Sequence, residues 1–350
     1  MRKLLPAALA IALAAGFLFL PQQTAAGASQ GIGTCLSVLV PSLFPFMAVT
    51  IFLVKSGVSA AIGRRLGGPL ARLLALPPAA APAVLMGMVG GYPTGARGVE
   101  ALCEMGALDA EEAGRMLLFS VNAGPAFVCT AVGAGFLGSA RAGVMLLLTH
   151  LAAGLVLGIL LGLPHHKKKS KPTASGRPAL SAGQALIASV HDAASAMLMM
   201  CAFVVAFSAV LALLQSVLSG KLLMAAASFC EVTLGCRTLA GTGAPLWCVS
   251  LALGWGGLCV HLQCLQGLSF PVHMGKFFLC RAAQGVLAAA FTAPFTKWVW
   301  LPTLPPAVEV FGSGLSSRPA LSGSIAAGAA LVVLCAVAVL DAGKKESNVL

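Results

Sequence analysis

Long apolar stretches alternate with short polar or glycine- and proline-rich stretches along almost the whole chain. A helix needs about 20 mostly apolar residues to cross a bilayer, and many of these stretches reach that length. The pattern predicts an all-α polytopic membrane protein with about eight to ten hydrophobic elements. The apolar stretches are residues 1–20, 31–54, 77–96, 113–137, 142–163, 184–214, 245–270, 275–300 and 322–340.

The stretch Gly87–Arg97, GMVGGYPTGAR, cannot form a plain helix although it belongs to an apolar run that begins near Pro77. Gly90 and Gly91 weaken helical backbone, and Pro93 lacks a hydrogen-bond donor. At membrane depth, irregular backbone is tolerated only where protein or a water-filled cavity covers it. We therefore expect a re-entrant or discontinuous helix here, an element that lines transport sites in other proteins.

Two further apolar stretches of the first half contain helix-breaking residues. Pro41 and Pro45 should interrupt the 31–54 span, and the sequence Asn122-Ala-Gly-Pro125 should break residues 113–137 in the middle. A buried amide and freed carbonyls can bind a polar solute or a cation at membrane depth. The alternative is a kink whose polar groups are satisfied by neighbouring helices.

The second half contains a carboxylate in an apolar setting, Glu231, within the mixed segment 221–243. A charge inside a membrane segment is costly and by default suggests function. In the alternative interpretation this segment lies at the interface and Glu231 pairs with Arg237.

Residues 245–270 form the expected counterpart of the first broken hairpin. They contain a glycine cluster at Gly254–Gly257, followed by His261 and Gln263. Trp255 takes a place in this segment similar to that of Tyr92 in the first. Corresponding glycine-broken segments in two halves are a sequence indicator of a transport site, so we expect two pseudo-repeats whose hairpins meet near the membrane midplane.

Composition agrees with the membrane assignment: 59% of the 350 residues are hydrophobic and only 9% are charged, against about 25% in soluble domains. The net charge is +12, and the basic residues lack aromatic neighbours, which favours cytoplasmic loops and lipid headgroups over nucleic acid. Basic clusters at Arg2–Lys3, at 55–72 and at 165–171 place the N-terminus and these loops in the cytoplasm.

The same features suggest the domain organisation. Residues 1–30 resemble a signal peptide or a retained first membrane helix, with a possible cleavage region at Ala25–Gly27. The remaining units are a first half at 31–163, a basic cytoplasmic linker at 164–183, a second half at 184–300, and a loop with a last membrane helix at 301–350.

No enzymatic, cofactor or metal motif emerges from the sequence. The eleven cysteines form no Cys-x-x-Cys pair and mostly lie in apolar runs, as small buried hydrophobes do. The run Gly133–Gly138 matches Gly-x-Gly-x-x-Gly but lacks a surrounding strand–helix–strand unit. Because zinc-protease and nucleophile-elbow motifs are also missing, we expect no catalytic residues, no cofactor and no metal.

Several sequence blocks resemble the YlbJ family of sporulation integral membrane proteins, which carries the "nucleoside recognition" or Gate domain shared in outline with concentrative nucleoside transporters and the iron transporter FeoB. The resemblance covers roughly residues 30–300, with Ala123 at a position where the family usually has serine or asparagine. The blocks are Pro41–Phe46, Gly91–Ala96, Asn122–Pro125, Glu231–Gly235 and Gly256–Gln263. The resemblance implies a spore-forming Gram-positive bacterium, a mother-cell or forespore membrane, and a role in forming the spore, including its cortex.

Two functions remain open at this point. A permease-like protein would bind an unidentified small solute or ion between its broken helices, whereas a scaffold would use the same polar groups to join helices and would partner other sporulation membrane proteins or further copies of itself. The candidate solute-binding residues are Gly91, Tyr92, Thr94, Gly95, Asn122, Gly124, Glu231, Gly256, Gly257, His261 and Gln263.

Overall fold

The structure is a computed structural model that describes residues 4–165 and 178–298; the expected 322–340 helix lies outside these ranges, as does most of the basic linker. Throughout the described residues the chain is helical and forms no strand. Up to the linker the helices are α1 (Leu4–Phe19), α2 (Pro21–Thr34), η1 (Cys35–Leu39), α3 (Val40–Lys55), α4 (Val58–Leu66), α5 (Gly68–Leu74), α6 (Ala80–Gly90), α7 (Tyr92–Glu104), α8 (Ala110–Ser120), η2 (Ala126–Phe136), α9 (Ala140–Gly162) and η3 (Leu163–His165). After it come α10 (Ala182–Val217), α11 (Gly220–Cys230), α12 (Val232–Gly241), α13 (Leu246–Trp255), α14 (Gly257–Leu265), α15 (Met274–Thr292) and η4 (Ala293–Trp298).

The expectation of an all-α multi-pass membrane protein is confirmed. In the described part of the chain four helical segments are long and apolar enough to cross a membrane, and two sharply bent helix pairs raise the number to six if each is one span. The four segments are Ala140–His165, Ala182–Val217, Leu246–Leu265 and Met274–Thr296.

The N-terminal helices differ from the expected simple spans. The chain bends by 101° between α1 and α2, and by 77° between α3 and α4. The expected interruption at Pro41 and Pro45 is wrong, because the backbone stays helical from α2 through η1 and α3. A π-helical turn, η1, directly precedes α3, and Pro41 sits in the first turn of α3, where a missing N–H is tolerated.

The predicted break at Gly91 is confirmed and produces a helical hairpin, called hairpin 1 here (α6–α7). Gly91 joins the two helices with φ +94° and ψ 176°, a conformation that favours glycine. The helices then pack face to face: a Cβ added to Gly87 would lie only 2.9 Å from the Cα of Gly95. Small residues at this contact allow the close backbone approach that membrane helices often use.

The expected break within residues 113–137 is also confirmed. After α8, residues 121–124 leave the helix, and the chain resumes as the π-helical η2. Helix α8 starts with a capping box in which the Asp109 carboxylate accepts the Glu112 N–H and the Glu112 carboxylate accepts the Asp109 N–H. We call residues Val121–Gly124 the first break.

The hairpin of the second half lies in residues 220–241 and not, as predicted, in residues 245–270. Helices α11 and α12 fold back on one another around Glu231 and form hairpin 2; a Cβ added to Gly235 would lie 2.6 Å from the Cα of Ser228. Residues 246–265 are a single candidate span with a break at Gly256, the second break, where φ is +84°. Fold-back needs a reversal of direction, and the left-handed turn at Gly256 gives none.

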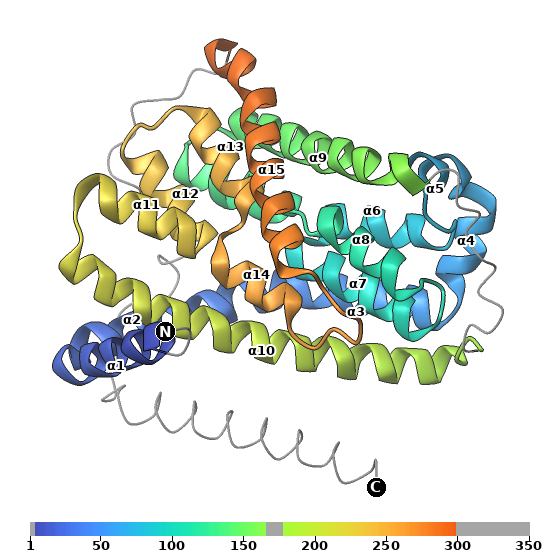
Figure 1. The fold of residues 1–350 in the computed structure, drawn as a ribbon, viewed down its shortest axis with the longest axis horizontal. Coiled ribbons are helices and arrows are strands. Elements are labelled where there is room, and N and C mark those ends of the chain that lie inside the picture. The colour runs from blue at the N-terminus through green and yellow to red at the C-terminus, as the bar shows by residue number, and fades with distance from the viewer. Residues whose placement is uncertain (1–3, 166–177, 299–350) are drawn as a thin grey trace, which may run out of the picture.

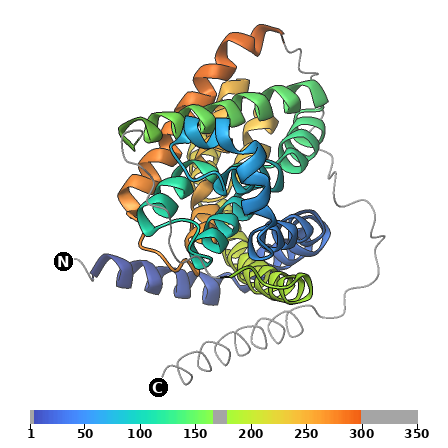
Figure 2. The same cartoon turned by 90° about the vertical axis from the view of Figure 1, so that its right-hand side faces the viewer.

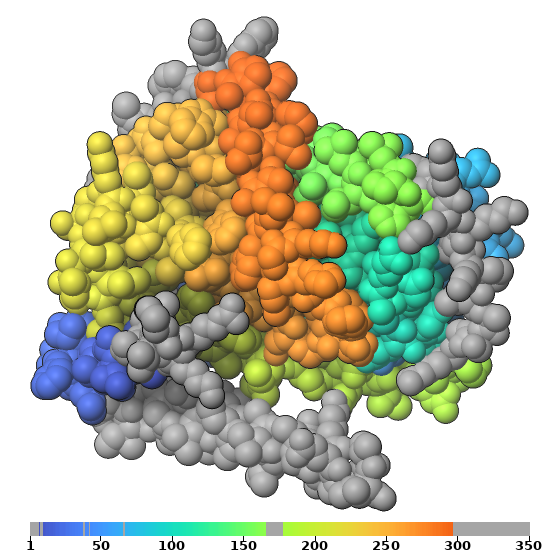
Figure 3. Space-filling view, in the orientation of Figure 1, coloured from blue at the N-terminus to red at the C-terminus, as the bar shows by residue number. Residues whose placement is uncertain are grey.

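A common element order therefore recurs: a hairpin, then a broken helix, then a long helix. The first series is hairpin 1, α8–η2 and α9, and the second is hairpin 2, α13–α14 and α15. Figures 1 and 2 show α9 and α10 on opposite sides of the molecule with hairpin 1 and α8 between them. Figure 3 shows α15, in orange, lying along the boundary between the two series.

The packing at hairpin 1 predicts a strong effect of Gly95→Ala. The added Cβ would lie 2.0 Å from the carbonyl oxygen of Ser120, and this backbone atom cannot move away alone. We expect a loss of about 1–3 kcal/mol, the usual result of overpacking, seen as a lower unfolding temperature of the purified protein in detergent. Gly33→Ala is the matched control, because a Cβ there meets no atom within 4 Å. Equal behaviour of the two variants would contradict the close packing.

Candidate solute site at the crossing of the broken helices

Each hairpin tip touches the break of the next helix in its own half. A Cβ added to Gly124, in the first break, would lie 3.0 Å from the backbone nitrogen of Gly91 at the tip of hairpin 1. A Cβ added to Gly257 would lie 3.0 Å from the Cα of Glu231 at the tip of hairpin 2. Glycines at both breaks therefore let backbone approach backbone, which brings freed peptide groups of two elements together.

Tyr92 connects the two halves. Its hydroxyl donates a 2.6 Å hydrogen bond to the carbonyl of Leu253, in the last turn of α13, and its ring lies 3.4 Å from the position of a Cβ on Gly256. The two glycine breaks at Gly91 and Gly256 are thus brought close together, whereas their meeting near the membrane midplane stays a prediction. The expected equivalence of Tyr92 and Trp255 is not confirmed, because Tyr92 belongs to a hairpin tip and Trp255 ends a broken helix.

Asn122 lies in the first break and is 1% exposed. Its amide nitrogen donates to the carbonyl of Phe119 at 2.9 Å, and its amide oxygen accepts from the Gln284 side chain at 2.8 Å. The backbone N–H of Ala123 donates to His150 Nε2 at 3.0 Å. Helices α9 and α15 therefore supply side chains that satisfy the broken segment.

Arg281 is the largest fully buried side chain of the described residues. Its guanidinium donates to the carbonyls of Leu118 and Val121, at the C-terminal end of α8. This end of a helix carries partial negative charge, so the buried cation has a favourable partner without a carboxylate. Arg281 also lies 5.9 Å from the centre of the Phe277 ring.

Glu231 caps α12. Its two carboxylate oxygens accept the backbone N–H groups of Thr233 at 2.9 Å and Leu234 at 2.7 Å. The alternative pairing with Arg237 is wrong, since no ion pair between these two described residues forms. We call the region where the hairpin tips at Gly91 and Glu231 contact the two breaks the crossing. The Glu231 carboxylate is half-buried beside the second break, so a charged group does lie at the crossing.

The other predicted site residues serve the local structure of their own elements. Thr94 donates to the carbonyl of Gly90 at 2.9 Å, and Gly95 packs on Ser120. His261 Nε2 lies 2.6 Å from the carbonyl of Trp255, which closes the second break, and Gln263 donates to the sulfur of Cys259. These residues line the crossing without converging on one point.

Several of the buried polar atoms that have no partner among the described residues lie in the same region. They include Nδ1 of His150, Nδ1 of His261 and Oε1 of Gln284, and all three side chains have 0% exposure. A buried polar atom without a partner is costly, and it often marks a site for a ligand or an ordered water. The region therefore has unused hydrogen-bonding capacity for a polar solute.

Three buried polar residues of this region, His150, Arg281 and Gln284, are not among the site residues predicted from the sequence. His150 lies in the expected span 142–163, and Arg281 and Gln284 lie in the expected span 275–300, where the sequence analysis assigns them no role. One signal could have identified them: ionisable or amide side chains inside membrane segments usually face the protein interior.

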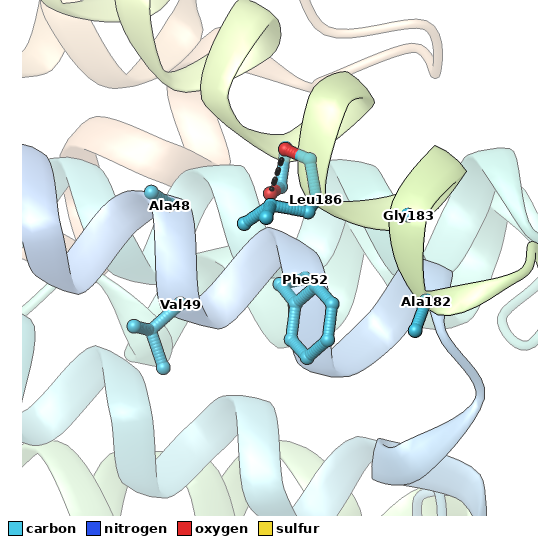
Figure 4. A pocket seen from close by; sticks show the side chains of 7 residues that line it. Ala48, Val49, Phe52, Ala182, Gly183 and Leu186 are labelled. Carbon is cyan, nitrogen blue, oxygen red and sulfur yellow. Dashed lines mark hydrogen bonds between the residues drawn. The ribbon is translucent and has the colours of Figure 1, made fainter.

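The crossing is closed in this structure, because Tyr92, Asn122, Gly124 and Gly256 are all buried. A groove of about 380 Å³ lies elsewhere, between α3 and α10 (Figure 4). Its lining is apolar apart from Ser189, whose hydroxyl donates to the carbonyl of Leu186. This groove suits hydrocarbon and not a polar solute.

Replacing Arg281 with methionine should destabilise the protein. The change leaves the carbonyls of Leu118 and Val121 buried without a donor, a loss of about 2–3 kcal/mol for hydrogen bonds to a charged group. The measurement is the unfolding temperature of the purified protein in detergent. Lys276→Met is the matched control, because Lys276 is exposed on the same helix. If both variants unfold at the wild-type temperature, Arg281 does not support the break.

Comparison with known proteins agrees with the resemblance seen in the sequence blocks. The chain is 26% identical over 355 aligned residues to the sporulation integral membrane protein YlbJ of Bacillus subtilis, and the alignment covers 87% of each chain. No family model matches the chain, and no solved structure matches it. The similarity extends over nearly the full length of both proteins, and it supports the resemblance of this chain to the YlbJ family of integral membrane proteins.

Proposed function

We propose that this chain is a permease-like protein of sporulation that moves a small polar solute or ion across a mother-cell or forespore membrane, in support of spore and cortex formation. The sporulation role comes from the name of the Bacillus subtilis relative. One observation supports a transport function: the tips of the two hairpins contact the two broken helices, and buried polar atoms without partners lie around this contact. Discontinuous helices of this type bind solutes and ions in other transporters.

Glu231 provides charge in this mechanism. Because its carboxylate accepts two backbone N–H groups, it is held at the hairpin tip in one orientation. A solute or a coupling cation at the second break would meet this carboxylate, and proton binding would release it from the end of α12. The crossing thus combines a fixed buried cation, Arg281, with the Glu231 carboxylate.

Transport requires the closed crossing to open, and hairpin 2 is the element suited to move. Ten of the 13 residues of α7 are buried, whereas only one of the 11 residues of α11 is. Gly220 and Gly243 bracket hairpin 2 with φ of +57° and +66°, and a Cβ at either would meet no atom within 4 Å. Hairpin 1 is held differently, since Arg97 donates to the Gln266 carbonyl and Glu100 accepts the Ser269 N–H.

The tip of hairpin 2 is closed by Trp255. Its indole N–H donates to the Phe229 carbonyl at 3.0 Å, and the two rings stack with centroids 5.3 Å apart. The His261 ring contacts the indole edge-to-face, with ring centroids 4.5 Å apart. The Trp255 contacts would therefore hold hairpin 2 at the second break, and their loss would let hairpin 2 move away from it.

A membrane scaffold remains the second candidate function. The observation that favours it is the density of bonds between the two halves, in which Tyr92, Asn122 and Arg281 each join distant helices. Such bonds are common glue between membrane helices. In that case the partners would be other sporulation membrane proteins or further copies of this chain, and hairpin 2 would stay closed.

The solute site is tested by Glu231→Gln and, separately, by Asn122→Ala in a spore-forming host that lacks its own relative. Glutamine keeps an acceptor for the α12 N–H groups while it removes the charge, so the fold should persist. We expect heat-resistant spores to fall about tenfold or more, the factor that a loss of about 1.4 kcal/mol of binding produces. Membrane abundance of Glu231→Gln, measured by immunoblot, should stay at the wild-type level.

Asp109→Asn is the matched control, because it neutralises another carboxylate that caps a helix, α8, away from the crossing. Sporulation defects that appear only when abundance falls would support the scaffold and contradict transport. The small-molecule and ion content of developing spores, with and without the protein, would then identify the solute class.

The opening of hairpin 2 is tested by cysteine labelling of the native protein. Cys236 lies on α12 with 0% exposure, and Cys264 lies on α14 with the same exposure. If hairpin 2 opens, a maleimide should label Cys236 faster than Cys264, with site-resolved rates from mass spectrometry. Trp255→Ala removes a ring stack and a hydrogen bond, so we expect the Cys236 rate to rise about tenfold.

Trp255→Phe serves as the comparison variant, because it keeps an aromatic stack and loses only the hydrogen bond. Its Cys236 rate should fall between those of the wild type and Trp255→Ala. Unchanged Cys236 labelling in Trp255→Ala, or equal acceleration at Cys264, would show that hairpin 2 does not open as a unit.

A further inference from the structure

Helices α4 and α5 form an elbow at one end of the molecule, which Figure 1 shows at its right-hand side and Figure 2 views from that end. The elbow (residues 58–74) begins after Gly57, whose φ of +76° allows α4 to turn away from α3 by 77°. If α3 crosses the bilayer, a helix at this angle lies close to the membrane plane. Such a position is typical of interfacial helices.

One face of the elbow is fixed to the protein. The hydroxyl of Ser59 donates to the Ala79 carbonyl at 2.8 Å, and a Cβ on Gly63 would lie 2.2 Å from the Pro78 carbonyl oxygen. At the end of α5, the Arg115 guanidinium donates to the Leu74 carbonyl at 2.7 Å. The elbow is therefore a rigid part of the fold and presents a defined outer face.

The outer face combines arginines with apolar side chains. Arg64, Arg65 and Arg72 are exposed and make no ion pair or hydrogen bond with described residues. Val58 and Ile62 lie beside Arg65 at helical spacing and are 37% and 38% exposed. A helix face that carries both cations and apolar groups suits a bilayer surface, where anionic headgroups lie above the hydrocarbon of the acyl chains.

Carboxylates at this end are already occupied by other groups. Glu104 and Asp192 both pair with Lys55, and Glu111 lies 3.2 Å from His165. No carboxylate of the described residues forms an ion pair with the elbow arginines, so their guanidinium groups are available to an anionic partner.

The described residues on both sides of the basic linker lie at the same end. It leaves the described residues at His165, one helical turn beyond Gly162, where a Cβ would lie 2.9 Å from the Leu74 carbonyl oxygen of the elbow. It returns at residue 178, and the N–H of Leu180 then donates to the Lys55 carbonyl. The intervening residues 166–177 include Lys167, Lys168, Lys169, Lys171 and Arg177.

We propose that the α4–α5 elbow is a docking surface for anionic phospholipid headgroups, with Arg64, Arg65 and Arg72 contacting phosphates while Val58, Ile62 and Leu73 enter the acyl boundary. An acidic protein would satisfy the arginines but would leave the interleaved apolar side chains without a hydrocarbon phase. Anionic lipid satisfies both, and it is the partner that basic segments next to membrane helices attract.

The test is arginine footprinting of the wild-type full chain in nanodiscs. Phenylglyoxal modification of each arginine is quantified by mass spectrometry in discs of phosphatidylcholine and in discs that also contain phosphatidylglycerol. We expect phosphatidylglycerol to slow modification of the three elbow arginines about fivefold, the scale that an anionic surface sets for one basic residue. The protection should weaken at high salt.

Arg141 provides the internal reference. It is exposed at the start of α9, about 30 Å along that helix from Gly162 at the elbow. Equal protection of Arg141, or no difference between the two lipids at the elbow, would overturn the proposal. So would protection in phosphatidylcholine discs by inorganic phosphate or by soluble polyglutamate at the level that phosphatidylglycerol gives.

A variant pair gives a second measurement. Arg64→Gln, Arg65→Gln and Arg72→Gln combined should bind fewer phosphatidylglycerol molecules by native mass spectrometry than the wild type. The control combination Arg141→Gln, Lys221→Gln and Lys276→Gln removes the same charge from other exposed positions and should keep wild-type binding. Equal losses in both would show a general charge effect and overturn the proposal, and the wild-type footprint decides the question if the elbow variant fails to fold.

Discussion

A helix broken inside a bilayer frees N–H and C=O groups that no water can satisfy, so side chains from other elements must reach them. This constraint explains the polar residues of the protein core. Arg281 donates hydrogen bonds to the carbonyls at the end of α8, and Tyr92 donates one to a carbonyl at the end of α13. His150 accepts a hydrogen bond from an N–H of the first break. Glu231 serves the start of α12 in the same way. Because most of these partners come from distant helices, the same bonds that allow the breaks also hold the two halves together.

A structure stabilised in this way can open only where few such bonds exist. Hairpin 1 is buried along most of its length and is bonded to the α14–α15 connection through Arg97 and Glu100. Hairpin 2 has an exposed outer helix, open glycines at both ends and one indole at its tip. This asymmetry separates the two proposed functions physically: a scaffold needs all contacts to stay closed, whereas a permease needs one set to be weak.

Part of this fold could be predicted from the conformational preferences of single residues in the sequence. Glycine and proline cannot continue a membrane helix without compensation, so the breaks at Gly91, Asn122 and Gly256 could be predicted. The hairpin around Glu231 could not be recognised, because its turn contains no glycine or proline, and the reversal depends on the carboxylate capping α12 and on packing at Gly235. The partners of the breaks were equally hidden: a lone histidine on α9 acquires meaning only when the fold brings it to a freed N–H more than twenty residues away.

The two ends of the molecule differ in a way that bears on mechanism. At the elbow end, Lys55 joins α3 to α7 and α10 through Glu104 and Asp192, and α4 and α5 are bonded to hairpin 1 and α8. Hairpin 2 lies toward the opposite end in Figure 1. A transport cycle needs a stationary frame against which the moving element does work, and a frame fixed in the membrane plane resists rotation better than one free to tilt. Headgroup contacts at the elbow would supply that fixation, so hairpin 2 could move against the crossing while the first half keeps its orientation in the bilayer.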